Sequence, residues 1–360
     1  MSQDQLFLPL ELLTIEVRPK LDFYTLLAFA KTATELYKGW IKYVLELPDR
    51  IIGRCDTERL SLFTSLTALN IPTLSFPVTY NITTLSYLTS LKTLTIPRNT
   101  LQIKDTDLAG MVSLTTLSLG DVPISDQGIS HLTNLTYLNF GHGMWNNTNG
   151  VITDNSIKEL CSLRYLNLGY TDRICDSSIS MLTALCTLLV GNNNGITNLE
   201  HLTSLVDLTL TSYTSHLWWQ NPQNLQAPKI FLPTTLTSLT NCKHLSDDDI
   251  KQLTRLTTLN LGSADNTISD DAIISLTSLT YLDLGCNNTI TDRGVEGLTN
   301  LTNLIIGSNR HVSIKYSYEA IVRGGKCLPY NFMGTVYNNV NTPRINNLRS
   351  SRYSTMNLAY

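Results

Sequence analysis

The chain has 360 residues, of which 42% are hydrophobic and 15% are charged, and its formal net charge is −3. This composition can build a folded core, which excludes a wholly disordered chain, and a pI of about 6.1 argues against a general nucleic-acid-binding protein. The chain also contains 61 Leu and 47 Thr, a surplus that predicts a short motif copied many times.

Targeting signals are absent from the sequence pattern. The first residues carry Asp4 and Glu11 but no basic region, which argues against a signal peptide. No run of about 18 apolar residues occurs, so no membrane contact is expected. The seven cysteines show no paired spacing, which favours a reducing compartment. We therefore expect a cytoplasmic or nuclear protein that is not secreted.

Residues 1–48 lie outside the repeated part of the chain and predict three short helices. Pro9 and Glu11 suit the first turn of one helix, and Asp22 can cap a second. A third amphipathic stretch begins near Thr34. Such a segment can cover the open apolar end of the structure that follows it.

Residues 49–309 contain a repeat of the form L-T-x-L-T-x-L-x-L-G. In LxxLxL the last two leucines lie two residues apart, so they point to one face of a short strand. A second block, I-[ST]-D-x-x-[IV]-x-x-L, follows most copies, and its apolar spacing predicts a helix. The copies begin at Leu66, Leu91, Leu114, Leu135, Leu163, Leu185, Leu205, Leu236, Leu256, Leu279 and Leu301.

These units cannot bury their apolar faces alone, so they must stack. The prediction is an α/β fold, a right-handed leucine-rich-repeat solenoid (horseshoe) of about eleven units. Residues at helix-cap positions are Ser125, Thr153, Ser246, Ser269 and Thr291. The Asp that follows each cap favours the positive helix start, which also explains Asp247, Asp248 and Asp249 better than a cation site does.

Two groups of residues are candidates for binding a protein target. Side chains that alternate with the inward leucines should face the concave side of the solenoid: Tyr137, Asn139, Tyr165, Asn167, Tyr281 and Asp283. Insertions should gather where strands end, and Trp145, Trp218 and Trp219 lie in the longest of them. Aromatic residues on loops are typical binding hot spots, although these three could instead pack beneath their loops.

Motifs for catalysis are missing. No phosphate-binding loop, nucleophile elbow or metal-ligand spacing occurs, so we expect neither an enzyme nor a metal or other cofactor. Cys175 and Cys186 occupy repeat positions and are interpreted as small core residues. Residues 310–360 form a Tyr/Asn-rich tail or cap with 7 basic residues and 1 acidic residue, a net charge of +6. The tail could touch an acidic partner or lie on the acidic body of its own chain.

The repeat resembles that of the F-box/leucine-rich-repeat proteins, in which a helix starting ITDxGL follows LxLxxC. ITDRGVEGL preceded by LDLGC, Leu282 to Cys286, carries the likeness most clearly. The segment LPLEL…LDFYTLLAFAKTATELY resembles an F-box, with matching residues at Leu8, Pro9, Glu11, Leu12, Leu21, Asp22, Leu26, Leu27 and Leu36.

This resemblance implies a function in ubiquitin-dependent protein degradation. An F-box docks a Skp-type adaptor of a cullin ubiquitin ligase, and the repeats hold the protein to be ubiquitinated. The residues expected to contact the adaptor are Leu8, Pro9, Leu12, Leu26 and Leu27. The alternative is a stand-alone leucine-rich-repeat scaffold whose N-terminal helices only cap the solenoid.

Overall fold

The computed structural model divides the chain into two compact units, residues 1–327 and residues 328–360. All residues described below belong to the first unit. The structure describes residues 65–70, 85–96, 103–120, 124–141, 152–169, 171, 173–191, 193, 195–210, 229–242, 245–262, 267–313 and 316. The predicted F-box-like segment and the tail beyond residue 316 lie outside these ranges, so both stay predictions.

Eleven strands form one parallel sheet in which the strand order follows the chain order. Each strand belongs to one of the eleven predicted repeat copies, which confirms the repeat as the unit of the fold. The strands are β1 (Ala68–Asn70), β2 (Thr93–Ile96), β3 (Thr116–Leu119), β4 (Tyr137–Asn139), β5 (Tyr165–Asn167), β6 (Thr187–Val190), β7 (Asp207–Leu210), β8 (Ser238–Thr240), β9 (Thr258–Asn260), β10 (Tyr281–Asp283) and β11 (Asn303–Ile305).

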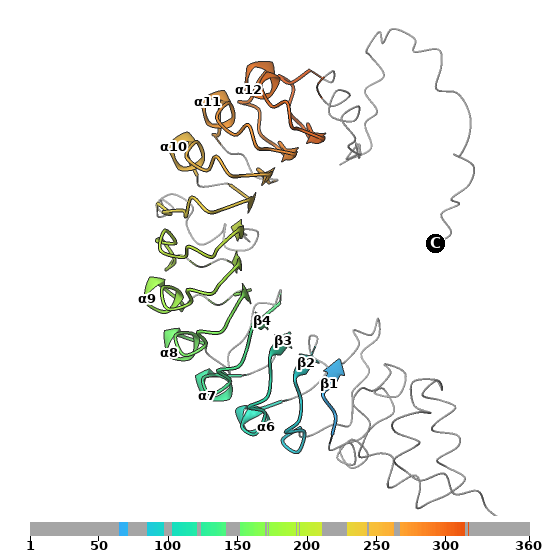
Figure 1. Cartoon of the computed structure of the whole chain (residues 1–360), viewed down its shortest axis with the longest axis vertical. Coiled ribbons are helices and arrows are strands. Elements are labelled where there is room, and N and C mark those ends of the chain that lie inside the picture. Colours follow the sequence, from blue (N-terminus) through green and yellow to red (C-terminus); the bar gives the residue numbers. More distant parts are fainter. Residues whose placement is uncertain are drawn as a thin grey trace, which may run out of the picture. The chain divides into compact units, whose positions relative to one another are not determined.

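Short helices lie on the other side of the stack from the strands (Figure 1). In the described ranges they are α6 (Asp105–Leu108), α7 (Asp126–Ile129), α8 (Asp154–Ile157), α9 (Asp176–Ile179), α10 (Asp247–Ile250), α11 (Asp270–Ile273) and α12 (Asp292–Glu296). Strands line the inner side of the curved solenoid, and helices line its outer side. The strands therefore form the concave face of the solenoid, as predicted.

The helices are shorter than the apolar spacing predicted. In the unit of α7, the buried residues Ile124 and Leu132 both lie outside the helix. The backbone continues after α7 in tight turns, in which Leu132 N donates to Ile129 O at 2.9 Å and Leu135 N donates to Leu132 O at 3.0 Å. These turns, rather than one long helix, produce the regular apolar spacing of the second block.

The core is one continuous hydrophobic cluster that runs through all described units. Its centre is a row of leucines, one in every strand, that are paired in register from strand to strand. All are fully buried except Leu304, which is 2% exposed. The row consists of Leu69, Leu94, Leu117, Leu138, Leu166, Leu188, Leu208, Leu239, Leu259, Leu282 and Leu304. Each leucine between the two ends of the row packs against the units before and after it, which is why no unit can fold alone.

Threonine hydroxyls join neighbouring units just before the strands begin. Thr257 Oγ1, for example, donates to the Thr237 carbonyl at 3.1 Å, and Thr280 Oγ1 donates to the Thr257 carbonyl at 3.0 Å. The same bond is made by Thr115, Thr136, Thr237 and Thr302. This repeated bond explains part of the threonine surplus, because the residue after the first leucine of a unit is well placed to reach the preceding turn.

The repeat pattern continues beyond residue 309. Asn309 Nδ2 donates to Ile290 O at 2.9 Å, as Asn287 Nδ2 donates to Ile268 O at 2.8 Å one unit earlier. Val312 and Tyr316 are buried, and they join the same core. The described start of the basic tail therefore covers the last unit of the solenoid.

Candidate functional site

The concave face presents two rows of side chains, one on each side of the buried leucines. We call the first the tyrosine row: Ala68, Thr93, Thr116, Tyr137, Tyr165, Thr187, Asp207, Ser238, Thr258, Tyr281 and Asn303. The second is the asparagine row: Asn70, Thr95, Ser118, Asn139, Asn167, Leu189, Thr209, Thr240, Asn260, Asp283 and Ile305. Most of these side chains are half-buried, so the face is polar, partly aromatic and open to a partner.

Two of the predicted target-binding residues, Tyr137 and Tyr165, form an aromatic pair on adjacent strands. Their ring centroids are 4.2 Å apart, and the ring planes are inclined by only 8°. Burial, the neighbouring Tyr137 and the negative charge of Asp207 raise the pKa of the Tyr165 phenol to about 12. The Tyr165 phenol therefore stays neutral at physiological pH. The two stacked rings offer a flat surface with polar ends.

Asn139 and Asn167, which were also predicted to bind a target, make hydrogen bonds within the chain. Asn139 Oδ1 accepts from Gly141 N at 2.7 Å and from Asn167 Nδ2 at 2.9 Å. Asn167 Oδ1 accepts from Gly169 N at 3.0 Å, and Asn167 is only 7% exposed. These amides hold the turns at the strand ends, which leaves less of their surface for a partner.

Tyr281 and Asp283 lie on one strand, two residues apart, and therefore on the same face. Burial and the charge of Asp283 raise the pKa of the Tyr281 phenol. Burial raises the pKa of the Asp283 carboxyl, although the hydrogen bond from Gly285 N, at 2.9 Å, opposes this effect. The predicted tryptophans Trp145, Trp218 and Trp219 lie outside the described residues, so their role stays a prediction.

The helix side contains a polar feature that the sequence analysis missed. The Asp that opens each described helix accepts hydrogen bonds from a Ser, Thr or Cys of the next unit, one from its backbone N and one from its side chain. For Asp270, Thr291 N and Thr291 Oγ1 both donate at 2.7 Å. The pairs of this aspartate ladder are Asp105–Ser125, Asp126–Thr153, Asp154–Cys175, Asp176–Thr197, Asp247–Ser269, Asp270–Thr291 and Asp292–Ser313.

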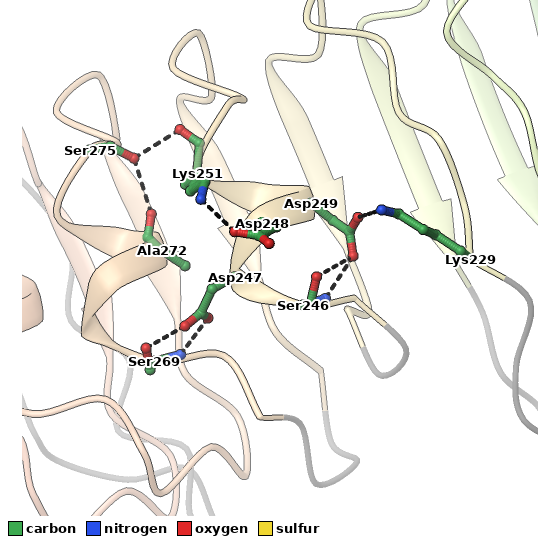
Figure 2. A network of polar contacts seen from close by, with 9 residues as sticks. All are labelled: Lys229, Ser246, Asp247, Asp248, Asp249, Lys251, Ser269, Ala272 and Ser275. Carbon is green, nitrogen blue, oxygen red and sulfur yellow. Dashed lines mark hydrogen bonds and ion pairs between the residues drawn. The ribbon is translucent and has the colours of Figure 1, made fainter.

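The three consecutive aspartates of α10 have separate partners (Figure 2). Asp247 accepts from Ser269 of the next unit, and Asp248 pairs with Lys251. Asp249 Oδ2 accepts from Ser246 N at 2.9 Å, and its other oxygen is 3.9 Å from Lys229 Nζ. Their spread over different partners agrees with the interpretation of these residues as part of the helix start.

The cysteines require two corrections. Cys175 and Cys186 are half-buried rather than core residues. Cys175 is the N-cap residue of α9, and its thiol donates to the Asp154 carboxylate of the preceding unit. Cys286 is also half-buried, whereas the next residue, Asn287, is fully buried. The cysteine likeness was one residue out of register, because the sixth position of LxLxxC falls on Asn287, whose amide satisfies the buried turn.

The described part of the chain contains neither a metal-ligand cluster nor a membrane-spanning helix. There, His, Cys, Asp and Glu side chains form no group of three or more that could hold a metal ion. No helix within the same ranges is long and apolar enough to cross a membrane.

The aspartate ladder should make stability depend on acid pH. Burial raises the pKa values of Asp154 and Asp176, but hydrogen bonds from the next unit outweigh it and lower both below the ordinary 3.8. Because the folded-state pKa of these two carboxyls is depressed, Asp154 and Asp176 stabilise the chain fully above about pH 3.8, and their contribution is lost as the pH falls through the lowered folded values. Asp176→Asn should therefore cost roughly 1–2 kcal/mol at neutral pH and much less in strong acid.

Urea unfolding followed by circular dichroism, repeated from neutral pH to strong acid, measures the free energy of unfolding of wild type and of Asp176→Asn. Asp271→Asn is the matched control, because Asp271 is exposed and its ion pair with Arg293, at 3.0 Å, lies on the surface. Parallel stability curves for wild type and Asp176→Asn down to strong acid would contradict the role of the ladder.

Comparisons with known proteins support the fold. No protein-family model matches the chain, and no curated protein matches its sequence. An internalin from Listeria monocytogenes matches in structure, with 22% identity over 86% of this chain and 94% of that chain, at a TM-score of 0.54. TLR13 in its complex with ssRNA13 matches with 20% identity over 71% of this chain and 42% of that chain, at a TM-score of 0.42.

Together, the eleven-stranded parallel sheet, the short helices and the internalin likeness define this chain as a leucine-rich-repeat solenoid. At 22% identity the internalin likeness shows the fold alone.

Proposed function

We propose that this chain is a non-catalytic binding protein that holds a protein target on its concave face. The main support is the pair of open rows on the strand face, whose polar and aromatic side chains alternate with the buried leucines. Such a surface can offer hydrogen bonds and flat aromatic contacts over many strands without any loss of core packing.

We further propose that this chain is the substrate-recognition subunit of a cullin-type ubiquitin ligase. Residues 6–48 would dock a Skp-type adaptor through the F-box-like residues, and the solenoid would bring the target to the ligase. The chain would act by raising the effective concentration of the target beside the ligase. Its place of action would then be the cytoplasm or the nucleus. The support here is the sequence resemblance alone.

Capture of partners from a eukaryotic lysate tests the adaptor. Leu8→Ala combined with Pro9→Ala in the full chain should abolish co-purification of a Skp-type adaptor, since both side chains are expected in the contact. Leu10→Ala is the control, because Leu10 occupies a free position of the LPxEL pattern. Adaptor retention by the double variant, or no adaptor with wild type, would contradict the ligase role and favour the stand-alone scaffold.

The target side is tested with a steric block. Thr258→Trp places a large neutral group on β9 in the tyrosine row, where Thr258 is half-buried and outside the leucine core. Captured targets should disappear, whereas the adaptor should stay. Thr254→Trp is the control on an exposed turn. A target that binds Thr258→Trp as well as wild type would place the binding surface elsewhere.

A further inference from the structure

Charge on the concave face has one sign. Among the residues of the tyrosine and asparagine rows, all of which the structure describes, only Asp207 and Asp283 are charged, and no Lys or Arg occurs. The nearest basic residues in sequence, Lys92 and Arg164, are exposed but precede β2 and β5, outside both rows. A partner that covers this face must therefore accommodate two carboxylates without help from basic groups in the rows.

Each carboxylate lies near a tyrosine. Asp207 is two strands from Tyr165 in the same row, which is about 10 Å at the usual strand spacing, and the small residue Thr187 lies between them. Asp283 follows Tyr281 by two residues on β10. Burial is the main cause of the raised pKa of both tyrosines, and the charge of the nearby carboxylate adds to it.

The Asp207 carboxylate makes no hydrogen bond or ion pair with another described side chain, and Asp283 uses one oxygen for Gly285 N. A half-buried carboxylate gains most from a partner that brings a positive charge and hydrogen-bond donors. A guanidinium group can supply both, and it can also lie flat on an aromatic ring.

We propose, on the basis of the proposed binding function, that the concave face recognises a basic segment of its protein target. One arginine or lysine side chain enters the space over Thr187, between the ring of Tyr165 and the carboxylate of Asp207. A second basic side chain binds at Tyr281 and Asp283. Tyr137 stacks on Tyr165 from the adjacent strand and so supports the aromatic wall of the first site.

The test uses the full chain and short fluorescein-labelled peptides of equal length, in which glycine alternates with arginine, serine or glutamate. Fluorescence anisotropy should show that wild type binds the arginine peptide more tightly than the other two. Asp207→Asn keeps the shape of the side chain and should weaken arginine-peptide binding about tenfold. Tyr165→Leu should weaken it about threefold, and Tyr165→Phe, which keeps the ring, should change it little.

Glu296→Gln is the charge-matched control, because it removes one negative charge from an exposed position of α12 on the helix side. Binding of the arginine peptide should be unchanged in this variant. The proposal is overturned if wild type does not prefer the arginine peptide, or if Asp207→Asn and Glu296→Gln weaken binding equally. It is also overturned if Tyr165→Leu and Tyr165→Phe bind alike.

Failure of this proposal is separable from failure of the proposed function. If the arginine peptide fails but captured targets are lost with Thr258→Trp, the concave face binds protein of a different chemistry. If Thr258→Trp also captures the targets as well as wild type does, the proposal that the concave face binds the target is contradicted too.

Discussion

Replacement of Leu166 by Ala is expected to destabilise the solenoid by roughly 2–5 kcal/mol. Leu166 is fully buried at the centre of the leucine row, in register with Leu138 on one side and Leu188 on the other. Truncation leaves a cavity between three stacked units, and the fixed strand spacing limits how far they can close on it. Urea unfolding followed by circular dichroism gives the change in free energy.

Leu189→Ala is the matched control, because it makes the same chemical change one strand away. Leu189 is half-buried in the asparagine row of the concave face, opposite Asn167. Its truncation should cost about 1 kcal/mol or less. If the two variants cost the same, or if Leu166→Ala costs under about half a kcal/mol, the strand register is wrong at β5.

Gly285→Ala is expected to destabilise the chain by about 3 kcal/mol or more, because two separate penalties add. The backbone of Gly285 has φ +54°, a left-handed conformation that side chains rarely adopt, and an added Cβ would lie 1.7 Å from the carbonyl oxygen of Gly262. The units cannot separate freely, since Cys286 N donates to Gly262 O and Ser308 N donates to Gly285 O. Thermal and urea unfolding measure the loss.

Gly297 offers the control for this substitution. It ends α12 with φ −79°, and nothing lies within 4 Å of an added Cβ. Gly297→Ala should therefore change stability by about half a kcal/mol or less. A Gly285→Ala variant as stable as Gly297→Ala would contradict the close approach of the glycine turns.

Prediction from sequence worked best for the strands. Each repeat copy carries its own period-two pattern, so the position of a strand depends on residues close together in the chain. All eleven strands fall on the predicted copies, and the predicted cap residues stand directly before their helices. The same local pattern gave too long a helix, because turns and short helices bury apolar residues at similar spacings.

Features that join one unit to the next could not be predicted in this way. Asp270 was interpreted as a charge at a helix start, but its carboxylate accepts hydrogen bonds from Thr291, 21 residues later. The signal was present, since Asp follows Ser or Thr in most units, yet local sequence does not show which residue of another unit it meets. Asn139 and Asn167 were assigned to a target for the same reason, because their mutual bond appears only when the strands pair.

The amino-acid sequence by itself determined the repeat, the inward leucines and which residues face the concave side, because these follow from spacing within one unit. Tertiary structure alone decided which of those residues have surface left for a partner. Stacking of the units places Tyr137 against Tyr165 and brings Asp207 into the same row, two strands from Tyr165. The amides of Asn139 and Asn167, by contrast, accept hydrogen bonds from the turns at the strand ends. Contacts between units depend on the register of strands 20 or more residues apart, and only the folded stack sets that register.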